Sequence, residues 1–226
     1  MTAHPTTIAP HQPAYIPWLG YLARFLEADI FVYLDDAQFE DGGWHKRNYI
    51  LSREGPIRLT VPVHKSGRFA QRINETVIYG TDWRDRHLRS LTQAYGREPY
   101  WPIVRDFVME PVLLNRGIGN LADLNICFLE AVVDYLGISV LQTRTSALGT
   151  SCKKAALLDE VAALLEATSV LVGAGAPKYL GALPQFRNGV EFRISNFRHP
   201  ASQAPALGRP IRRKPAVRTS SSPRLA

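Results

Sequence analysis

The sequence predicts an α/β protein with a mainly parallel sheet, helices on its faces and a helical subdomain at about 83–136. Short apolar runs, which are typical of buried parallel strands, alternate with amphipathic helical stretches along the chain. A length of 226 residues and an apolar fraction of 46% suffice for a well-packed core. We therefore expect one α/β domain over residues 1–200.

The individual elements follow from local patterns. Residues 6–10 are predicted as a strand, and 18–28 as a helix because its apolar residues recur every three or four positions. Residues 30–34 form an apolar run and are predicted as a buried strand. A later helix has clear ends, since Asn120 suits its N-cap and Gly137 its C-cap. The same criteria predict the remaining strands at 58–63, 138–142, 169–172 and 190–194, and the helices at 83–95, 100–115, 120–136 and 153–167.

The positive charge of the chain is concentrated near its C-terminus. Of the formal net charge of +7, six charges come from residues 201–226, which contain no acidic residue. The rest is nearly neutral, so its electrostatics give no reason to expect nucleic-acid binding. The proline- and serine-rich composition of 201–226 predicts a disordered basic tail. It is also the composition that out-of-frame translation of GC-rich DNA gives, which leaves a frameshifted end as an alternative.

Composition also bears on the compartment. No run of 18 apolar residues occurs, so we expect no membrane span. The N-terminus lacks the pattern of a signal peptide. The two cysteines, Cys127 and Cys152, lie on different predicted elements and favour a reducing cytoplasm over a disulfide framework. Because no CxxC, HExxH or GxSxG motif is present, the sequence assigns neither a metal nor a cofactor.

Polar residues follow the first two predicted strands. His11 and Gln12 close the first strand, where His11 could act as a general acid or base and Gln12 could bind a polar group of a substrate. The alternative is that both satisfy backbone groups of a proline-rich loop. Asp35 and Asp36 close the second strand, and one of them could bind Mg²⁺ or a substrate amine. They face one site only if the chain turns there, and the other carboxylate is expected as a cap.

A long polar stretch at 37–55 is predicted as a loop that contacts a substrate. Arg47 is its strongest candidate, because a guanidinium binds a carboxylate or phosphate through two hydrogen bonds. The alternative is a solvated surface loop. Tyr15, from the loop after the first strand, is expected in the wall of the same site. The other predicted substrate contacts are Gln38, Trp44 and Asn48.

A second glycine-containing segment could bind an anion. Gly173 and Gly175 follow the predicted strand 169–172, and Lys178 comes soon after. Backbone amides after a strand can surround an anion. Neither a full GxGxxG nor a Walker pattern accompanies them, so the prediction rests on position alone.

The segment His11–Tyr21, HQPAYIPWLGY, together with 28–39 and with Trp44, Arg47 and Asn48, resembles the WbqC-like family. The resemblance covers about residues 6–200. The first strand–loop–helix also resembles the nucleotidyl-transferase type of α/β fold in shape, through His11, Gly20 and Tyr21, which leaves nucleotide binding open.

The family resemblance implies a role in the synthesis of a surface polysaccharide such as O-antigen, or of a specialised metabolite. It implies a small-molecule substrate, an activated amine or an amino sugar, and we expect a transferase that forms an amide by acyl or aminoacyl transfer. The alternative is a non-catalytic substrate-binding or accessory protein of the same pathway. We expect neither nucleic acid nor a membrane as a partner.

Overall fold

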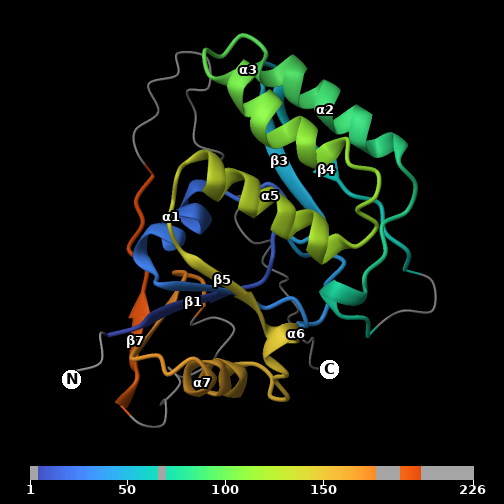
Figure 1. Cartoon of the computed structure of the whole chain (residues 1–226). Coiled ribbons are helices and arrows are strands. Elements are labelled where there is room, and N and C mark those ends of the chain that lie inside the picture. The colour runs from blue at the N-terminus through green and yellow to red at the C-terminus, as the bar shows by residue number, and fades with distance from the viewer. Residues whose placement is uncertain (1–4, 66–69, 177–188, 200–226) are drawn as a thin grey trace, which may run out of the picture.

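A five-stranded, fully parallel sheet forms the centre of the protein (Figure 1). The computed structural model describes residues 5–65, 70–176 and 189–199. The predicted tail at 201–226 and Lys178 lie outside the described residues. The strands run in the order β5-β2-β1-β6-β7, so the first strand of the chain lies in the middle. The parallel α/β fold that the sequence predicts is confirmed. Its strands are β1 (Thr7–His11), β2 (Ile30–Tyr33), β5 (Leu141–Arg144), β6 (Ser169–Val172) and β7 (Glu191–Ile194).

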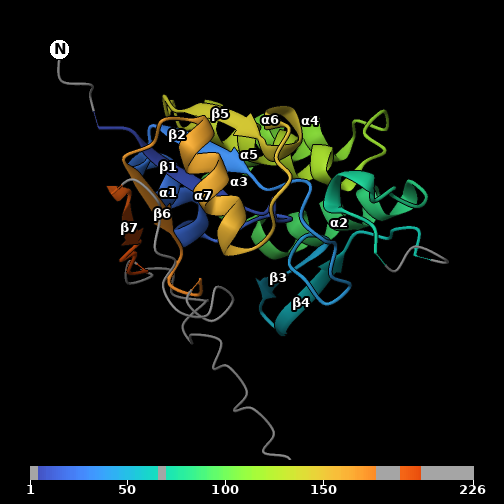
Figure 2. The same cartoon turned by 90° about the horizontal axis from the view of Figure 1, so that it is seen from below.

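Helices cover both faces of this sheet (Figures 1 and 2). On one face, α1 (Leu19–Glu27) and α5 (Leu121–Tyr135) pack against alternate residues of the strands, such as Phe31. On the other face, α7 (Ala155–Leu164) packs against the residues between them, such as Val32. Because both faces are covered, the central strands are apolar throughout rather than alternating.

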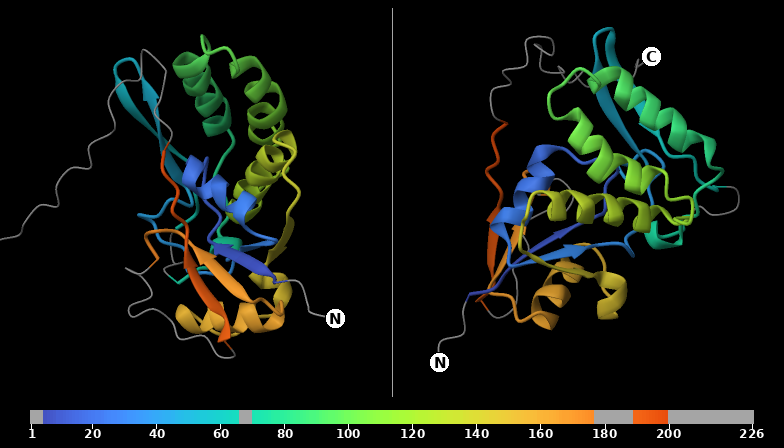
Figure 3. Two further views of the ribbon diagram at one scale, coloured as in Figure 1. Left: turned by 90° about the vertical axis from the view of Figure 1, so that its left-hand side faces the viewer. Right: turned by 45° about the horizontal axis from the view of Figure 1, so that its top comes forward.

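A helical layer and a β-hairpin lie together beyond α5 (Figure 3). Trp83, Phe128 and Leu59 belong to one buried cluster that joins the helices to the hairpin. Asn120 caps α5 by accepting hydrogen bonds from two backbone amides, and Gly137 follows it with φ of 63°, as predicted. The additional elements are α2 (Asp82–Tyr95), α3 (Trp101–Val104), the π-helical turn η2 (Arg105–Met109), α4 (Glu110–Leu113), β3 (Arg47–Ser52) and β4 (Gly55–Thr60).

Two predicted elements need correction. The stretch 37–55 is not one loop, because β3 begins at Arg47 and pairs antiparallel with β4. Gly55, with φ of 127°, makes the tight turn between these strands. The predicted helix 100–115 is divided by η2. Pro111 follows η2 and has no amide hydrogen for the carbonyl four residues before it, which accounts for the wider turn.

The structure also contains two short elements that the sequence did not predict. They are the 3₁₀ turn η1 (Ile73–Glu75) and the single helical turn α6 (Thr145–Leu148). Both are too short for a periodic pattern to develop, so only tertiary contacts reveal them.

We expect Arg84→Met to lower the free energy of unfolding by about 3 kcal/mol, since three buried carbonyls lose a charged donor. The Arg84 side chain is 2% exposed and donates to the carbonyls of Val112, Leu113 and Ile118. Urea denaturation measures the change, with the exposed Arg89→Met on the same helix as the control. A similar loss in both variants would contradict this role.

Candidate functional site

The sheet order places a crossover site between β1 and β6. From β1 the chain moves outward to β2 on one side, whereas β6 and β7 extend the sheet on the other side. In open α/β sheets, ligands bind outside the carboxyl ends of the strands at the point where the order reverses. His11 is the last residue of β1, and Gly173 follows the last residue of β6. We refer to His11, Arg24 and Gly173 as the crossover site.

His11 is held as a neutral imidazole, and its second ring nitrogen has no hydrogen bond to any residue that the structure describes. Its Nδ1 lies 2.8 Å from the carbonyl oxygen of Gln12, and because a carbonyl only accepts, Nδ1 carries the proton. Nε2 therefore presents a lone pair. Burial lowers the pKa of His11 to about 3, and the nearby charge of Arg24 contributes to the decrease. The ring packs edge-on against Tyr21 at 4.5 Å between centroids.

Arg24 enters the site from α1, and sequence reasoning missed it. The side chain is 1% exposed, and its guanidinium lies 4.9 Å from the centre of the Tyr21 ring. Nε and Nη1 are buried and have no hydrogen-bond partner among the described residues. Burial lowers the pKa of Arg24 from its usual value. The available signal was a basic residue on the apolar face of a helix, between Tyr21 and Phe25.

Gly173 borders the guanidinium of Arg24. A Cβ atom at Gly173 would lie 3.4 Å from Nη1 of Arg24, which places the start of the predicted anion-binding loop beside a cation. The carbonyl oxygen of Gly173 accepts from the amide of Ala176 at 2.9 Å, so the chain turns directly after β6. Gly173 and His11 are thus both close to Arg24 in the structure. Gly175 is described as part of this turn.

The loop after His11 is fastened to the chain before β3. The Tyr15 amide donates to the Trp44 carbonyl at 3.0 Å, and the Asn48 side chain donates to the Tyr15 and Ile16 carbonyls. These contacts hold Ile16 at φ of 44°, a conformation that β-branched residues rarely adopt. The Asn48 side chain therefore supports the loop by binding the loop's backbone carbonyls. The strained turn at Ile16 fixes the point at which β1 ends.

Tyr15 and Gln12 differ in their placement. Tyr15 is fully buried, and its hydroxyl lies 2.8 Å from Nδ1 of His87, within the core beneath the loop. Burial raises the pKa of Tyr15. Gln12 is half-buried beside His11, and its carbonyl also accepts from the Tyr21 hydroxyl at 3.1 Å. Its side-chain amide has no hydrogen bond within the described part of the chain.

The two carboxylates after β2 fasten α6. The chain turns at Asp35 and Asp36, so that both accept from the Thr145 hydroxyl. Asp35 is 1% exposed and also accepts from the Ser146 amide at 3.0 Å and the Ser146 hydroxyl at 2.6 Å. Asp36 is half-buried and accepts from the Thr150 hydroxyl at 3.2 Å. In the described residues, no hydrogen bond or ion pair joins either carboxylate to His11.

The remaining predicted contacts lie around the start of β3. Arg47 donates to the carbonyl of Gly42 within its own loop, and no hydrogen bond or ion pair among residues the structure describes links it to the crossover site. The Trp44 side chain is 53% exposed, and Gln38 is exposed. Trp44 packs against Tyr49, and Gln38 forms a β-bridge with Arg72. Within the described residues, no hydrogen bond joins the Arg47, Trp44 or Gln38 side chain to His11.

We expect Asn125→Leu to loosen the loop after His11 and to lower the free energy of unfolding by about 2 kcal/mol, because two buried carbonyls lose their donor. The Asn125 amide is fully buried in α5 and donates to Pro13 at 3.2 Å and to His45 at 2.7 Å. Hydrogen exchange of the 12–18 amides and urea denaturation measure both effects. Gln93→Leu, at an exposed position, is the control. Unchanged exchange in the Asn125 variant would show that α5 does not hold this loop.

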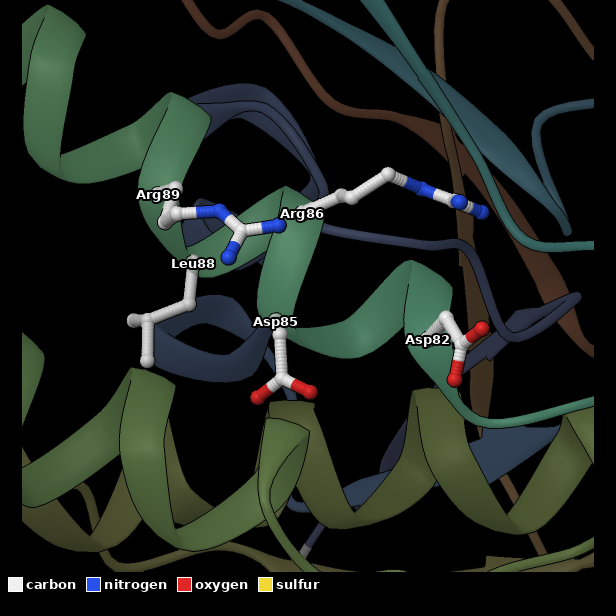
Figure 4. Close-up of a pocket in the computed structure, with 5 residues that line it drawn as sticks. All are labelled: Asp82, Asp85, Arg86, Leu88 and Arg89. Carbon is white, nitrogen blue, oxygen red and sulfur yellow. The ribbon is translucent and has the colours of Figure 1, made fainter.

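Two hollows lie elsewhere on the molecule. One is lined by a single helix, α2, and the charged side chains along it point in different directions (Figure 4). Asp85 in this hollow pairs with Arg116 at 3.5 Å. The other borders α7 beside Cys152, where the Glu160 carboxylate accepts from the Cys152 amide at 2.8 Å. Neither hollow shares a residue with the crossover site.

The described residues contain neither a cluster of metal-binding side chains nor a helix that could span a membrane. Among residues 5–65, 70–176 and 189–199, no three His, Cys, Asp or Glu side chains are grouped so that they could hold a metal ion. Within the same residues, none of the helices combines the length and apolar character needed to cross a membrane.

Comparison with known proteins identifies relatives. A model of the WbqC-like protein family matches residues 12–205 of the chain. The chain is also similar to an uncharacterized protein of Mycobacterium tuberculosis (strain ATCC 25618 / H37Rv), at 36% identity over 160 residues. This alignment spans 66% of the present chain and 69% of the relative. No solved structure matches the chain significantly.

Proposed function

The chain belongs to the WbqC-like protein family, and from that premise we propose that it is a biosynthetic transferase that forms an amide on a small amine. The acceptor is an amino sugar or another amine precursor of a surface polysaccharide or specialised metabolite. The donor is an activated acyl or aminoacyl group. The observation that carries this proposal is the Nε2 lone pair of His11 at the carboxyl end of the central strand, which no described residue engages in a hydrogen bond.

The reaction needs a group that accepts the proton of the amine. As the amine nitrogen attacks the acyl carbon, the new C–N bond forms and the bond to the leaving group breaks. Nε2 of His11 takes the proton from the attacking nitrogen and passes it to the leaving group. Gln12 is proposed to bind a polar group of the substrate, and the half-buried Asp36 to hold its amine.

A non-catalytic substrate-binding protein is the second candidate. The pKa of about 3 for His11 favours it, because a catalytic base works best with a pKa near the operating pH. The two free cysteines, Cys127 and Cys152, fit a reducing compartment, and we propose the cytoplasm as the location for either function.

An acyl-transfer assay tests the proposed function. The full chain is incubated with an acyl thioester or an acyl phosphate as donor and with hydroxylamine or a panel of amino sugars as acceptor. Hydroxamate or amide formation is followed by colour and by mass. We expect product with the parent protein and almost none with His11→Asn. Saturable binding of the amino sugars without product from any donor would instead support the substrate-binding protein.

A further inference from the structure

On the basis of the proposed function, we infer that Arg24 is the anchor of an anion subsite at the crossover between β1 and β6, which binds the carboxylate or phosphate group of a substrate. The subsite consists of the Arg24 guanidinium and the adjoining backbone at Gly173. His11 lies outside the subsite and, like Arg24, packs against the Tyr21 ring.

The charge of Arg24 is only partly compensated within the described residues, through the nearby charge of Glu27. A buried guanidinium is costly unless it is paired and hydrogen-bonded. Arg24 forms no ion pair with a described carboxylate, and the nearby Glu27 accepts instead from the Ser195 hydroxyl at 3.0 Å. The Tyr21 ring covers one face of the guanidinium, but a ring cannot accept in-plane hydrogen bonds from Nε and Nη1. An oxyanion supplies such acceptors.

Arg84, the other fully buried arginine, shows what a structural arginine looks like in this chain. Its Nη1 and Nη2 donate to three backbone carbonyls, and its guanidinium also lies over a ring, that of Trp83. Arg24 is equally buried, yet neither its Nε nor its Nη1 has an acceptor among the described residues, whereas in Arg84 only Nε lacks one. The comparison indicates that Arg24 is retained for a group that joins it from outside the chain.

Gly173 borders the guanidinium with backbone alone. Its backbone does not occupy the left-handed region, so the position does not require glycine for conformational reasons. A Cβ atom would stand 3.4 Å from Nη1 of Arg24, so any side chain here would contact the guanidinium that we propose to bind the anion. The position at the end of β6 is the edge at which α/β sheets bind ligands.

An anion in this subsite would also change His11. Burial is the main reason for the lowered pKa of His11, and the titratable groups that lower it further are Arg24 on α1 and His45 on the adjoining loop. A bound anion offsets the charge of Arg24, so it removes that contribution and raises the pKa of His11. The substrate would thereby strengthen the base that acts on it.

The test uses the full chain with inorganic phosphate and with acetate, each compared with chloride at equal ionic strength. Thermal unfolding reports binding, because a ligand of the native state raises the melting temperature. Arg24→Met removes the charge, Gly173→Ala places a methyl group against the guanidinium, and the exposed Arg58→Met on β4 is the control. A phosphate response larger than the acetate response assigns the subsite to a phosphate group, and the reverse order assigns it to a carboxylate.

We expect the parent and Arg58→Met to respond to at least one of the two anions. Arg24→Met should bind about 10–100-fold more weakly, the scale of lost hydrogen bonds to a charged group, and Gly173→Ala should also bind more weakly. In chloride alone, Arg24→Met should melt at or above the parent, because it removes an unpaired buried charge. An unresponsive parent, an undiminished response of Arg24→Met, or melting of that variant far below the parent in chloride would each overturn the inference.

His11→Asn separates this inference from the proposed function. It leaves Arg24 and Gly173 intact, so the variant should retain the anion response. Loss of acyl transfer with normal anion binding supports both proposals. If the parent protein binds the anion but makes no product, the anion subsite is supported and only the proposed transferase activity is contradicted.

Discussion

His11→Asn should lower the rate of acyl transfer by about 10²- to 10⁴-fold, the usual contribution of a positioned acid or base. An asparagine amide can still donate to the Gln12 carbonyl, as Nδ1 of His11 does at 2.8 Å. It has no atom that replaces Nε2. The substitution therefore keeps the structural hydrogen bond and removes the proton acceptor.

The measurement is kcat and KM for the parent and His11→Asn, with the exposed His64→Asn as the control. A base that acts only in the chemical step should lower kcat and leave KM almost unchanged. If His11→Asn turns over at a rate near that of the parent, His11 only shapes the loop.

Acidification should be the strongest perturbation of stability. His45 and His87 are 4% and 6% exposed, and burial lowers the pKa of each to about 4. The unfolded chain takes up protons on histidine below about pH 6.5, whereas the native state does not until about pH 4. Stability is therefore full above pH 6.5 and falls as the pH drops toward 4. At about 1.4 kcal/mol per histidine and pH unit, these two histidines account for a loss of about 4 kcal/mol at pH 5, and His11, with its pKa lowered to about 3, adds about 2 kcal/mol.

The surroundings of His87 explain why it resists protonation. The Thr60 amide donates to its Nε2 at 3.2 Å, so Nδ1 carries the proton that lies toward Tyr15. A second proton on Nε2 would face an N–H donor. Urea denaturation at pH 7, 6 and 5 measures the slope, and His87→Gln should reduce it by about one third whatever its stability at pH 7. Equal slopes in the two proteins would show that His87 does not cause the acid sensitivity.

The sequence predicts the parallel sheet well because the relevant patterns are local. The apolar run at 30–34 and the cap at Asn120 each depend on neighbouring residues, and both appear in the structure. The hairpin β3–β4 was missed because Arg47 and Asn48 made its first strand look like a polar loop. Its pairing depends on the turn at Gly55, which a scan for apolar periodicity does not weigh.

Site residues were harder to predict, because their meaning depends on distant partners. Placing His11 at the end of β1 needed only the strand pattern, and the structure puts it there. Arg24 could not be placed from a local pattern, because its neighbour Gly173 lies far along the chain and only the folded sheet brings the two residues together. The sequence predicts that Asp35 lines a crevice. In the structure its oxygens accept hydrogen bonds from α6, an element too short to give a periodic pattern in the sequence.

The central place of β1 has a consequence for how the chain is made. β1 pairs on one side with β2, which follows closely, but on the other side with β6, through Thr7 with Ser169 and Ile8 with Val170. Synthesis runs from the N-terminus, so one edge of β1 stays open until the ribosome has released most of the protein. Such long-range pairing slows folding and leaves an unpaired apolar edge that can associate with other chains. We expect nascent chains that end before β6 to depend on chaperones, and chains that include it to fold without them.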